Sequence, residues 1–201
     1  LVRSRVLGDV YKRQVYIGTH AGGLTVLHRN SGKMESFNQL NSQLVNENVY
    51  AILPDKGGNL LLGTLSALVS FNPEKKSFTT IDKEKDGTPF TSQRITILFR
   101  DSHKRLWIGG EEGISVFQQE GLEIEKVPIL PESSVTKTFT NCIYEADNGI
   151  IWVGTREGFY CFNEKEKKIK RYTTANGLPN NVVYGVPVSY THLTLPTTSR
   201  V

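Results

Sequence analysis

The 201-residue chain carries 24 basic and 20 acidic residues, which gives a formal net charge of +4 and a sequence pI near 9.0. No apolar run approaches the roughly 20 residues of a membrane-spanning helix, so the sequence predicts no transmembrane segment. No signal sequence opens the chain. The basic balance by itself favours a nucleic-acid partner, an indication that depends on where the charges lie.

A short motif recurs along the chain at a nearly constant spacing. Its central glycines are 45, 46 and 45 residues apart. A constant period in this range is typical of stacked copies of one supersecondary unit. The four copies of the motif are Ile17-Gly18-Thr19, Leu62-Gly63-Thr64, Ile108-Gly109-Gly110 and Val153-Gly154-Thr155.

Each period predicts four short β-strands. Apolar residues surround the motif, and a second apolar run follows after a tight turn, which indicates a β-hairpin. A strand with spaced aromatic residues ends the period, and a continuous apolar run precedes each of the later three motifs. Because the continuous runs do not alternate apolar and polar residues, we expect them to be buried on both faces. These runs are 49–53, 95–99 and 140–144.

Four strands in about 45 residues are typical of a β-propeller blade. The sequence therefore predicts an all-β fold of four-stranded antiparallel blades, with the continuous run innermost and the motif strand second. We expect an open arc of three complete blades and two partial ones, because closed propellers usually have about 4–8 blades. In chain order the segments are a partial blade of three strands at 15–45, blades at 46–90, 91–136 and 137–175, and the first strand of a further blade at 180–186.

Several residues of the repeat are interpreted as structural. The glycines Gly18, Gly63, Gly109 and Gly154 define the motif, and Trp107 and Trp152 precede two of them. Their place in the repeat predicts that both tryptophans lie in the core between blades. The turns between first and second strands contain Asp55, Asp101 and Asp147, which we expect to accept hydrogen bonds from turn N–H groups.

The repeat resembles the two-component regulator propeller repeats. The motif of that family is most complete from Ile143 through Gly149, Trp152-Val153-Gly154-Thr155 and Gly158 to Phe162, and 176–181 is similar to its Gly-Leu-Pro-x-Asn connector. The resemblance covers about 15–186, and the recurring pairs of WD40 and kelch repeats are absent from the sequence. It implies a part of a large propeller in the periplasmic sensor region of a hybrid two-component system histidine kinase. Such receptors commonly detect oligosaccharides.

The two ends of the chain do not follow the repeat. Residues 1–14 and 187–201 resemble translated sequencing-adapter tails, and we interpret both as non-native flanks. A degenerate blade edge is the alternative for the first, because Leu7 and Asp9 stand near the positions of a strand and its turn. The flanks hold five basic residues and one acidic residue, so 19 of each remain in the repeats and their net charge is zero. No nucleic-acid partner is therefore expected.

The sequence offers little sign of catalysis. His20, His28 and His103 fall in or beside separate turns without metal-ligand spacing, and no Gly-x-Ser-x-Gly elbow or phosphate-binding loop occurs. Cys142 and Cys161 fall on strands that a third strand separates, which places them beyond disulfide reach. We expect no catalytic residue, no metal and no cofactor in this region, whereas the parent protein would carry a histidine kinase domain.

A binding role fits the sequence better. In a propeller the loops that enter each first strand and those between second and third strands lie on one face around the channel. Here the entering loops are rich in Asn, Gln, Ser and Thr, which match sugar hydroxyls, and arginines in these loops suit a uronate or sulfate. The candidate ligand-binding residues are Arg94, Arg156, Glu157 and Asn180. The alternative is that these loops are polar only because they are exposed.

Together these features predict a fragment of a periplasmic ligand-sensing propeller of a two-component receptor. Its expected partners are an oligosaccharide and the remaining blades of the parent chain, which alone would connect it to a membrane. A scaffold for a protein partner is the alternative. A carbohydrate-active enzyme ranks last, because the innermost strands begin near Asn48, Arg94 and Thr138 rather than at a repeated acid.

Overall fold

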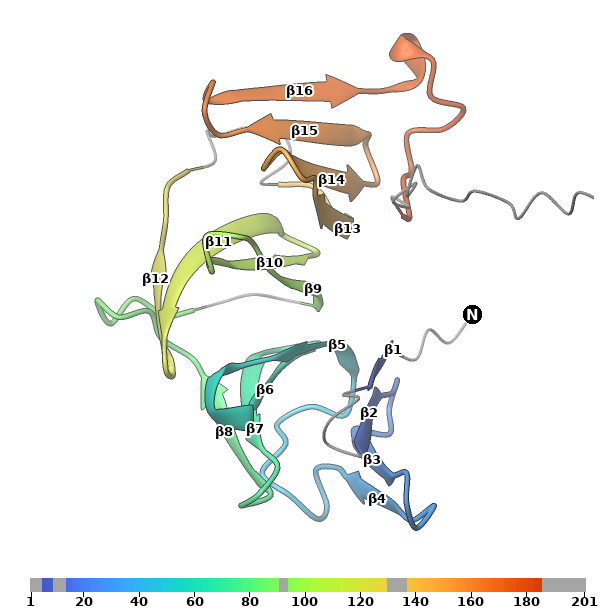
Figure 1. The fold of residues 1–201 in the computed structure, drawn as a ribbon, viewed down its shortest axis with the longest axis vertical. Coiled ribbons are helices and arrows are strands. Elements are labelled where there is room, and N and C mark those ends of the chain that lie inside the picture. The colour runs from blue at the N-terminus through green and yellow to red at the C-terminus, as the bar shows by residue number, and fades with distance from the viewer. Residues whose placement is uncertain (1–4, 9–13, 91–93, 130–136, 186–201) are drawn as a thin grey trace, which may run out of the picture.

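The protein is an open arc of β-sheets. The computed structural model describes residues 5–8, 14–90, 94–129 and 137–185. These residues form four sheets of four strands, in each of which the strands follow one another in chain order and pair antiparallel. Figure 1 shows the sheets fanned around a common inner edge without closing a ring. The predicted all-β, open propeller arc is confirmed.

Each sheet is one blade, and the blades are numbered here in chain order. Their strands, blade by blade, are β1 (Arg5–Gly8), β2 (Gln14–Gly18), β3 (Leu24–His28) and β4 (Met34–Phe37); β5 (Val49–Pro54), β6 (Leu60–Thr64), β7 (Leu68–Asn72) and β8 (Ser77–Ile81); β9 (Ile95–Arg100), β10 (Leu106–Gly110), β11 (Gly113–Glu120) and β12 (Glu123–Lys126); and β13 (Thr140–Glu145), β14 (Ile151–Thr155), β15 (Phe159–Asn163) and β16 (Lys168–Tyr172).

The first strand of every blade is innermost, as predicted, because β1, β5, β9 and β13 contact one another in succession (Figure 1). The expectation that these strands are buried on both faces is met only in part. All residues of the second strands β6 and β10 are buried, whereas β5 and β9 each contain half-buried positions. Strands β6 and β10 each have a paired strand on either side and a blade over each face, while an innermost strand borders the open centre of the arc.

The first blade differs from its prediction. Instead of three strands from residue 15, it has four, because β1 pairs with β2 and sets Leu7 opposite Tyr16. The pairing supplies partners for the N–H and C=O groups along an edge of β2, which an exposed edge would leave unpaired. Blade one is therefore complete. That 1–14 is a non-native flank stays a prediction.

The end of the arc also differs from its prediction. Residues 180–185 form no strand, although the Val183 N–H donates to the Thr155 carbonyl over 2.8 Å. The equivalent bond at the junction of blades one and two runs from Val49 to Thr19 over 3.0 Å. The chain thus begins along the path of a next innermost strand without pairing into a sheet. Residue 186 and the predicted flank 187–201 lie outside the described residues.

Three apolar cores join the four blades. Successive residues of a second strand point to opposite sides of its sheet, so each strand contributes to two cores. In blade three, Leu106 and Ile108 pack with blade two, whereas Trp107 packs with Ile151 and Val153 of blade four. The same alternation in β6 divides Leu60 and Leu62 from Leu61. Stability therefore depends on contacts between blades as much as within them.

The motif glycines lie where neighbouring blades come closest. A Cβ added to Gly63 would lie 2.7 Å from the carbonyl oxygen of Ile95, at the start of β9. At Gly18 the same addition would lie 2.7 Å from the carbonyl oxygen of Val49. The threonine after the glycine closes the next turn, since the Thr64 hydroxyl donates to the Ala67 carbonyl over 2.8 Å. The glycine and threonine of the motif thus serve close packing between blades and formation of the turn, rather than ligand binding.

The two tryptophans have different surroundings. Trp107 is fully buried between blades three and four. Trp152 is half-buried, because Ile151 and Val153 point toward blade three and Trp152 points away from it. Its predicted place in a core between two blades is therefore wrong for the described residues, in which no fifth sheet follows blade four.

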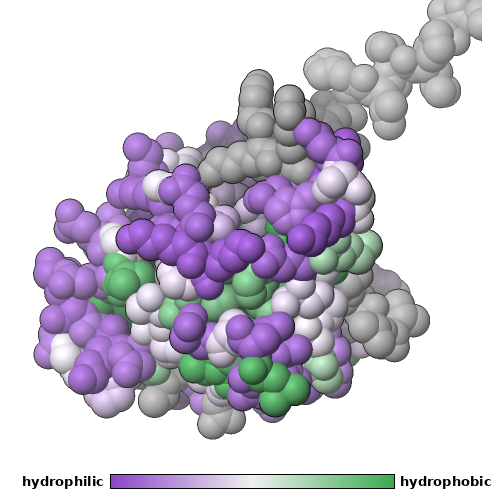
Figure 2. Space-filling model, turned by 90° about the horizontal axis from the view of Figure 1, so that it is seen from below, coloured by the Kyte–Doolittle hydropathy of each residue, from purple (hydrophilic) through white to green (hydrophobic). Residues whose placement is uncertain are grey.

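Little of the described chain is helical. The helical turns η1 (Lys56–Gly58) and η3 (Thr174–Asn176) have three residues each. No helix within the described ranges is long and apolar enough to cross a membrane. No disulfide joins Cys142 and Cys161 in the described part of the chain, as predicted. The side seen in Figure 2 is mostly hydrophilic, with small hydrophobic patches.

Candidate functional site

The candidate site is the face onto which the innermost strands open. On this face, the turn between the second and third strands of one blade contacts the residue directly before the first strand of the following blade. The Arg94 N–H, for example, donates to the Leu65 carbonyl over 2.7 Å. This contact joins the β6–β7 turn of blade two to the start of β9 in blade three, so the face is built at blade junctions.

Arg94 is held in an unusual state on this face. Its φ is 49°, in the left-handed region that a residue with a Cβ rarely adopts. Its guanidinium carbon lies 5.8 Å from the centre of the Tyr50 ring, within the range of a cation–π contact. The Nε atom is buried and has no hydrogen-bond partner among the described residues.

Arg156 lies against an aromatic ring in the same way. Its guanidinium carbon is 4.0 Å from the centre of the Phe139 ring. The backbone N–H of Arg156 also donates to the Phe139 carbonyl over 3.2 Å. The side chain is exposed and takes part in no ion pair with any described residue. The ring therefore fixes the guanidinium while its N–H groups still face solvent.

The other two predicted residues have local partners. The Glu157 carboxylate lies 3.8 Å from Nη2 of Arg171, and Nε of Arg171 donates to the Glu157 carbonyl over 3.1 Å. The side-chain oxygen of Asn180 accepts from the N–H of Val182 over 2.8 Å, which forms a turn. Glu157 and Asn180 therefore both stabilise local structure, and their role in ligand binding stays a prediction.

A row of side chains links the two arginines along the inner edge. Tyr50 lies 6.4 Å from His20 on one side and carries Arg94 on the other. Two residues after Arg94, the Thr96 hydroxyl donates to the Thr140 carbonyl over 3.1 Å, and Thr140 directly follows Phe139. We call His20, Tyr50, Arg94, Phe139 and Arg156 the inner-edge row.

Sequence reasoning missed the two aromatic members of the row. Tyr50 is the second residue of β5, and Phe139 directly precedes β13, so both stand where a first strand begins. An aromatic residue at the entry of an innermost strand was the available signal. In the sequence Tyr50 stands within one continuous apolar run and Phe139 directly before another, and neither position by itself indicates an arginine partner.

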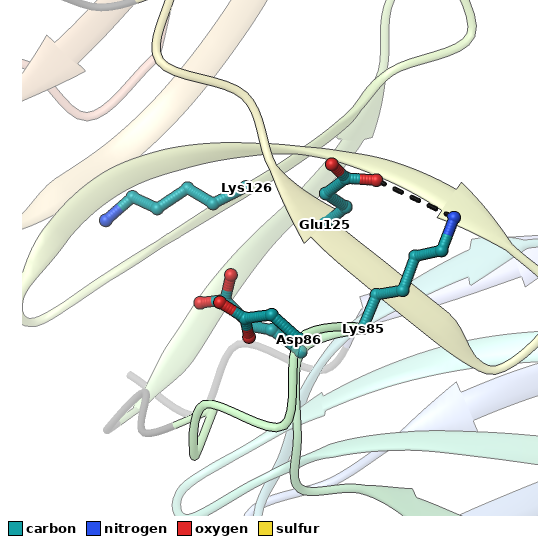
Figure 3. Close-up of a pocket in the computed structure, with 5 residues that line it drawn as sticks. Lys85, Asp86, Glu125 and Lys126 are labelled. Atoms are coloured by element: carbon teal, nitrogen blue, oxygen red, sulfur yellow. Dashed lines mark ion pairs between the residues drawn. The ribbon is translucent and has the colours of Figure 1, made fainter.

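A separate cavity of about 390 Å³ opens on the outer rim. Figure 3 shows Lys85 and Asp86 of the β8–β9 connector facing Glu125 and Lys126 of β12. Lys85 and Glu125 form an ion pair of 3.9 Å, and hydrogen bonds from Thr88 lower the pKa of Asp86. No three His, Cys, Asp or Glu residues in the described segments are grouped to hold a metal ion. This cavity joins a connector to a strand and contains none of the predicted site residues.

The opposite face of the arc carries polar links between blades. The Asp55 carboxylate accepts from Arg100 over 3.0 Å and from Gln119 over 2.9 Å, both in blade three. The prediction that Asp55 caps its own turn is therefore wrong, since its side chain makes no cap hydrogen bond. Asp101 fulfils the prediction, because it accepts from the Arg105 N–H over 2.8 Å.

Four adjoining four-stranded blades whose first strands lie innermost define a segment of a β-propeller. Residues 133–157 match the sequence model of the family described as two component regulator propeller. The match confirms the resemblance seen in the motif, for the segment that it covers.

The chain is also similar to a histidine kinase in sequence and to several solved structures in fold. Over 93 residues the chain is 28% identical to Histidine kinase P4 of Formosa agariphila, which covers 45% of this chain and 7% of that protein. The fold is similar to the extracellular domains of two proteins of B. thetaiotaomicron described as hybrid two component systems. For one the TM-score is 0.70 with 19% identity, over 87% of this chain and 23% of that one. For the other the values are 0.64 and 21%, over 82% and 22%.

The fold is not confined to sensors. An ancestral GH74 enzyme has a TM-score of 0.60 with 16% identity, over 86% of this chain and 24% of that one. Similarity at this level of identity shows the fold alone. The chain spans less than a quarter of the length of all these proteins.

Proposed function

We propose that the chain is part of the extracytoplasmic sensor propeller of a two-component signalling receptor. The observation that carries the proposal is the match of residues 133–157 to the regulator propeller family. The 28% identity to a histidine kinase supports the same class of parent protein. A periplasmic location and a kinase domain elsewhere in the parent belong to this proposal.

The ligand that we propose is an oligosaccharide bound on the face of the inner-edge row. Two guanidinium groups there lie against aromatic rings, and the turns of this face expose polar residues such as Ser66 and Glu157. Sugars are commonly bound by such combinations, because hydroxyl groups need donors and acceptors while ring carbons pack on aromatic faces. Signalling would follow if the ligand favours one arrangement of the parent receptor over another.

A carbohydrate-active enzyme is the second candidate, because a GH74 enzyme shares the fold. Glycoside hydrolysis needs two carboxyl groups about 5–10 Å apart, one on each side of the scissile bond. On the candidate face Glu157 is held by Arg171, while Glu111 and Glu112 are neighbours in the turn between β10 and β11. The match of residues 133–157 to the regulator propeller family favours the sensor over the enzyme.

The experiment uses the full-length protein in membranes. Autophosphorylation is measured with and without a library of oligosaccharides, and the glycans are analysed for cleavage in the same samples. We expect one class of glycan to change the rate of phosphorylation while remaining intact. A glycan that is hydrolysed without any phosphorylation would favour the enzyme instead.

A further inference from the structure

We propose that the ligand is acidic: Arg94 and Arg156 of the inner-edge row receive the carboxylate or sulfate groups of a sugar. The inference rests on the proposed sensing function and names the chemical class of its ligand. Tyr50 and Phe139 belong to the site as well, because they hold the two guanidinium groups.

The state of Arg94 is the first observation. A buried N–H without a partner is rare in folded proteins, and so is a positive φ at a residue with a Cβ. Arg94 combines both, since its φ is 49° and its Nε is buried and unpaired among the described residues. Strained and unpaired groups gather at functional sites. Because Nε itself is buried, the acid group is expected to meet the terminal nitrogens of Arg94.

The second observation is the pair Arg156 and Glu157. An acidic neighbour in sequence would ordinarily cancel the charge of Arg156. Here Glu157 is paired with Arg171 instead, and Arg156 is paired with a ring. The positive charge of Arg156 thus stays uncompensated by any described residue, on an exposed surface.

The guanidinium group selects the kind of substituent. It has five N–H donors and no acceptor, and its planar edge matches two oxygens at once. A sugar hydroxyl both donates and accepts, so its O–H group finds no acceptor on an arginine. A carboxylate or a sulfate has acceptors alone and binds an arginine through two parallel hydrogen bonds.

The remaining charges on the face favour a sugar over a simple anion. Glu111 and Glu112 are exposed in the turn between the second and third strands of blade three. Their carboxylates repel an anion but accept hydrogen bonds from hydroxyl groups. A ligand that satisfies both sets carries acid groups and hydroxyl groups together, as uronic acids and sulfated sugars do.

The test begins with a glycan array that carries acidic and neutral oligosaccharides, probed with the purified full-length protein. Each bound glycan is then titrated calorimetrically beside its neutralised form, which is the methyl ester for a uronate and the desulfated sugar for a sulfate. We expect acidic glycans to bind and neutralisation to weaken binding at least about 10-fold. The two neutralised forms separate the carboxylate source from the sulfate source.

Four variants place the effect on the inner-edge row. Arg156→Ala is expected to weaken binding about 10- to 100-fold, and Arg156→Lys less, because lysine keeps the charge without the paired donors. Arg94→Asn is expected to weaken binding while leaving the fold as stable or more so, since Asn tolerates a positive φ. The control is Arg29→Ala, an equal loss of charge in the exposed β3–β4 turn on the opposite face.

Three results overturn the inference. Binding of neutral glycans alone, or acidic binding that both Arg156→Ala and Arg94→Asn leave unchanged, contradicts it while the proposed sensing function stands. Binding of no glycan at all overturns both.

Discussion

Blades three and four place a tryptophan at the same position of the repeat, in different surroundings. Trp107 is fully buried against blade four, and its Nε1–H donates to Asp101 over 2.8 Å. Trp152 is half-buried and stacks on Phe159 of its own blade, with ring centres 5.0 Å apart. A motif residue thus contributes its full packing only where a following blade covers it.

The turns between first and second strands repeat the contrast. Asp101 in blade three is buried and accepts from Arg105 and Trp107. Asp147, in the corresponding turn of blade four, is exposed. The junction of blades three and four is therefore a closed core with a polar margin, whereas the outer side of blade four is a surface with the same kinds of residue.

The largest expected effect separates the two tryptophans. Trp107→Ala is expected to lower the free energy of unfolding by about 3–5 kcal/mol, because it leaves a cavity between blades. Trp152→Ala is expected to cost less than half as much, since part of its surface is already exposed. Urea unfolding of both variants measures the difference. Equal losses would show that the outer side of blade four is as well packed as the junction.

The two aspartates come next. Asp101→Ala is expected to cost about 3 kcal/mol, because it strands buried donors of Arg105 and Trp107. Asp147→Ala serves as the matched control and is expected to stay within about 0.5 kcal/mol of the parent, as exposed substitutions usually do. Thermal unfolding of the two variants and the parent measures the two losses of stability. A comparable drop for both would remove the distinction between buried and exposed turns.

The repeat explains how much of this was predictable. The period and the hairpin patterns predicted strand order and the open arc, because propeller blades are local units stacked in chain order. Burial of individual strands was less accessible, since a continuous apolar run looks the same beside an open centre as inside a core. The extra strand β1 was missed because the 1–14 segment lacks the motif, although a backbone edge pairs with little regard to side chains.

The candidate site was predicted only in part. Arg94 and Arg156 follow from their loop positions, and the structure brings each against a ring. The Tyr50 and Phe139 rings could not be predicted as their partners, because each cation–π pair joins residues that are distant in the sequence and have no fixed spacing. The ion pairs of Glu157 with Arg171 and of Asp55 with Arg100 were equally unpredictable, because each joins residues that are distant in the sequence.

A third prediction concerns the close approach of blades. Gly63→Ala is expected to cost about 1–3 kcal/mol, because the new methyl group meets the backbone oxygen of Ile95, which cannot move freely. At Gly109 the nearest atom is the Thr140 methyl group at 3.0 Å, so Gly109→Ala is expected to cost less. Chemical unfolding of both variants tests the ranking. A larger cost at Gly109 would contradict the distinction between rigid and adjustable neighbours.

The smallest expected effect is a pH dependence at the junction of blades three and four. Arg105 donates to both carboxylate oxygens of Glu164 over 2.7 Å, and these hydrogen bonds lower the pKa of Glu164 although partial burial acts against them. A carboxylate whose pKa is lower in the folded state stabilises the fold above its unfolded pKa of about 4.3. That stabilisation is lost as the pH falls through the lowered value.

Glu164→Gln is therefore expected to be less stable than the parent at pH 7, and the difference is expected to shrink as the pH falls below about 4.3. The difference should remain below about 1 kcal/mol, because the Glu164 side chain is 39% exposed and solvent screens the pair. Glu166→Gln is the control, since its partner Lys168 lies 3.5 Å away in the same hairpin and both are exposed. Unfolding curves of the three proteins from pH 7 to pH 3 provide the measurement. A difference at Glu164 that persists unchanged at pH 3 would show that the substitution acts through packing rather than through the charge that spans the junction.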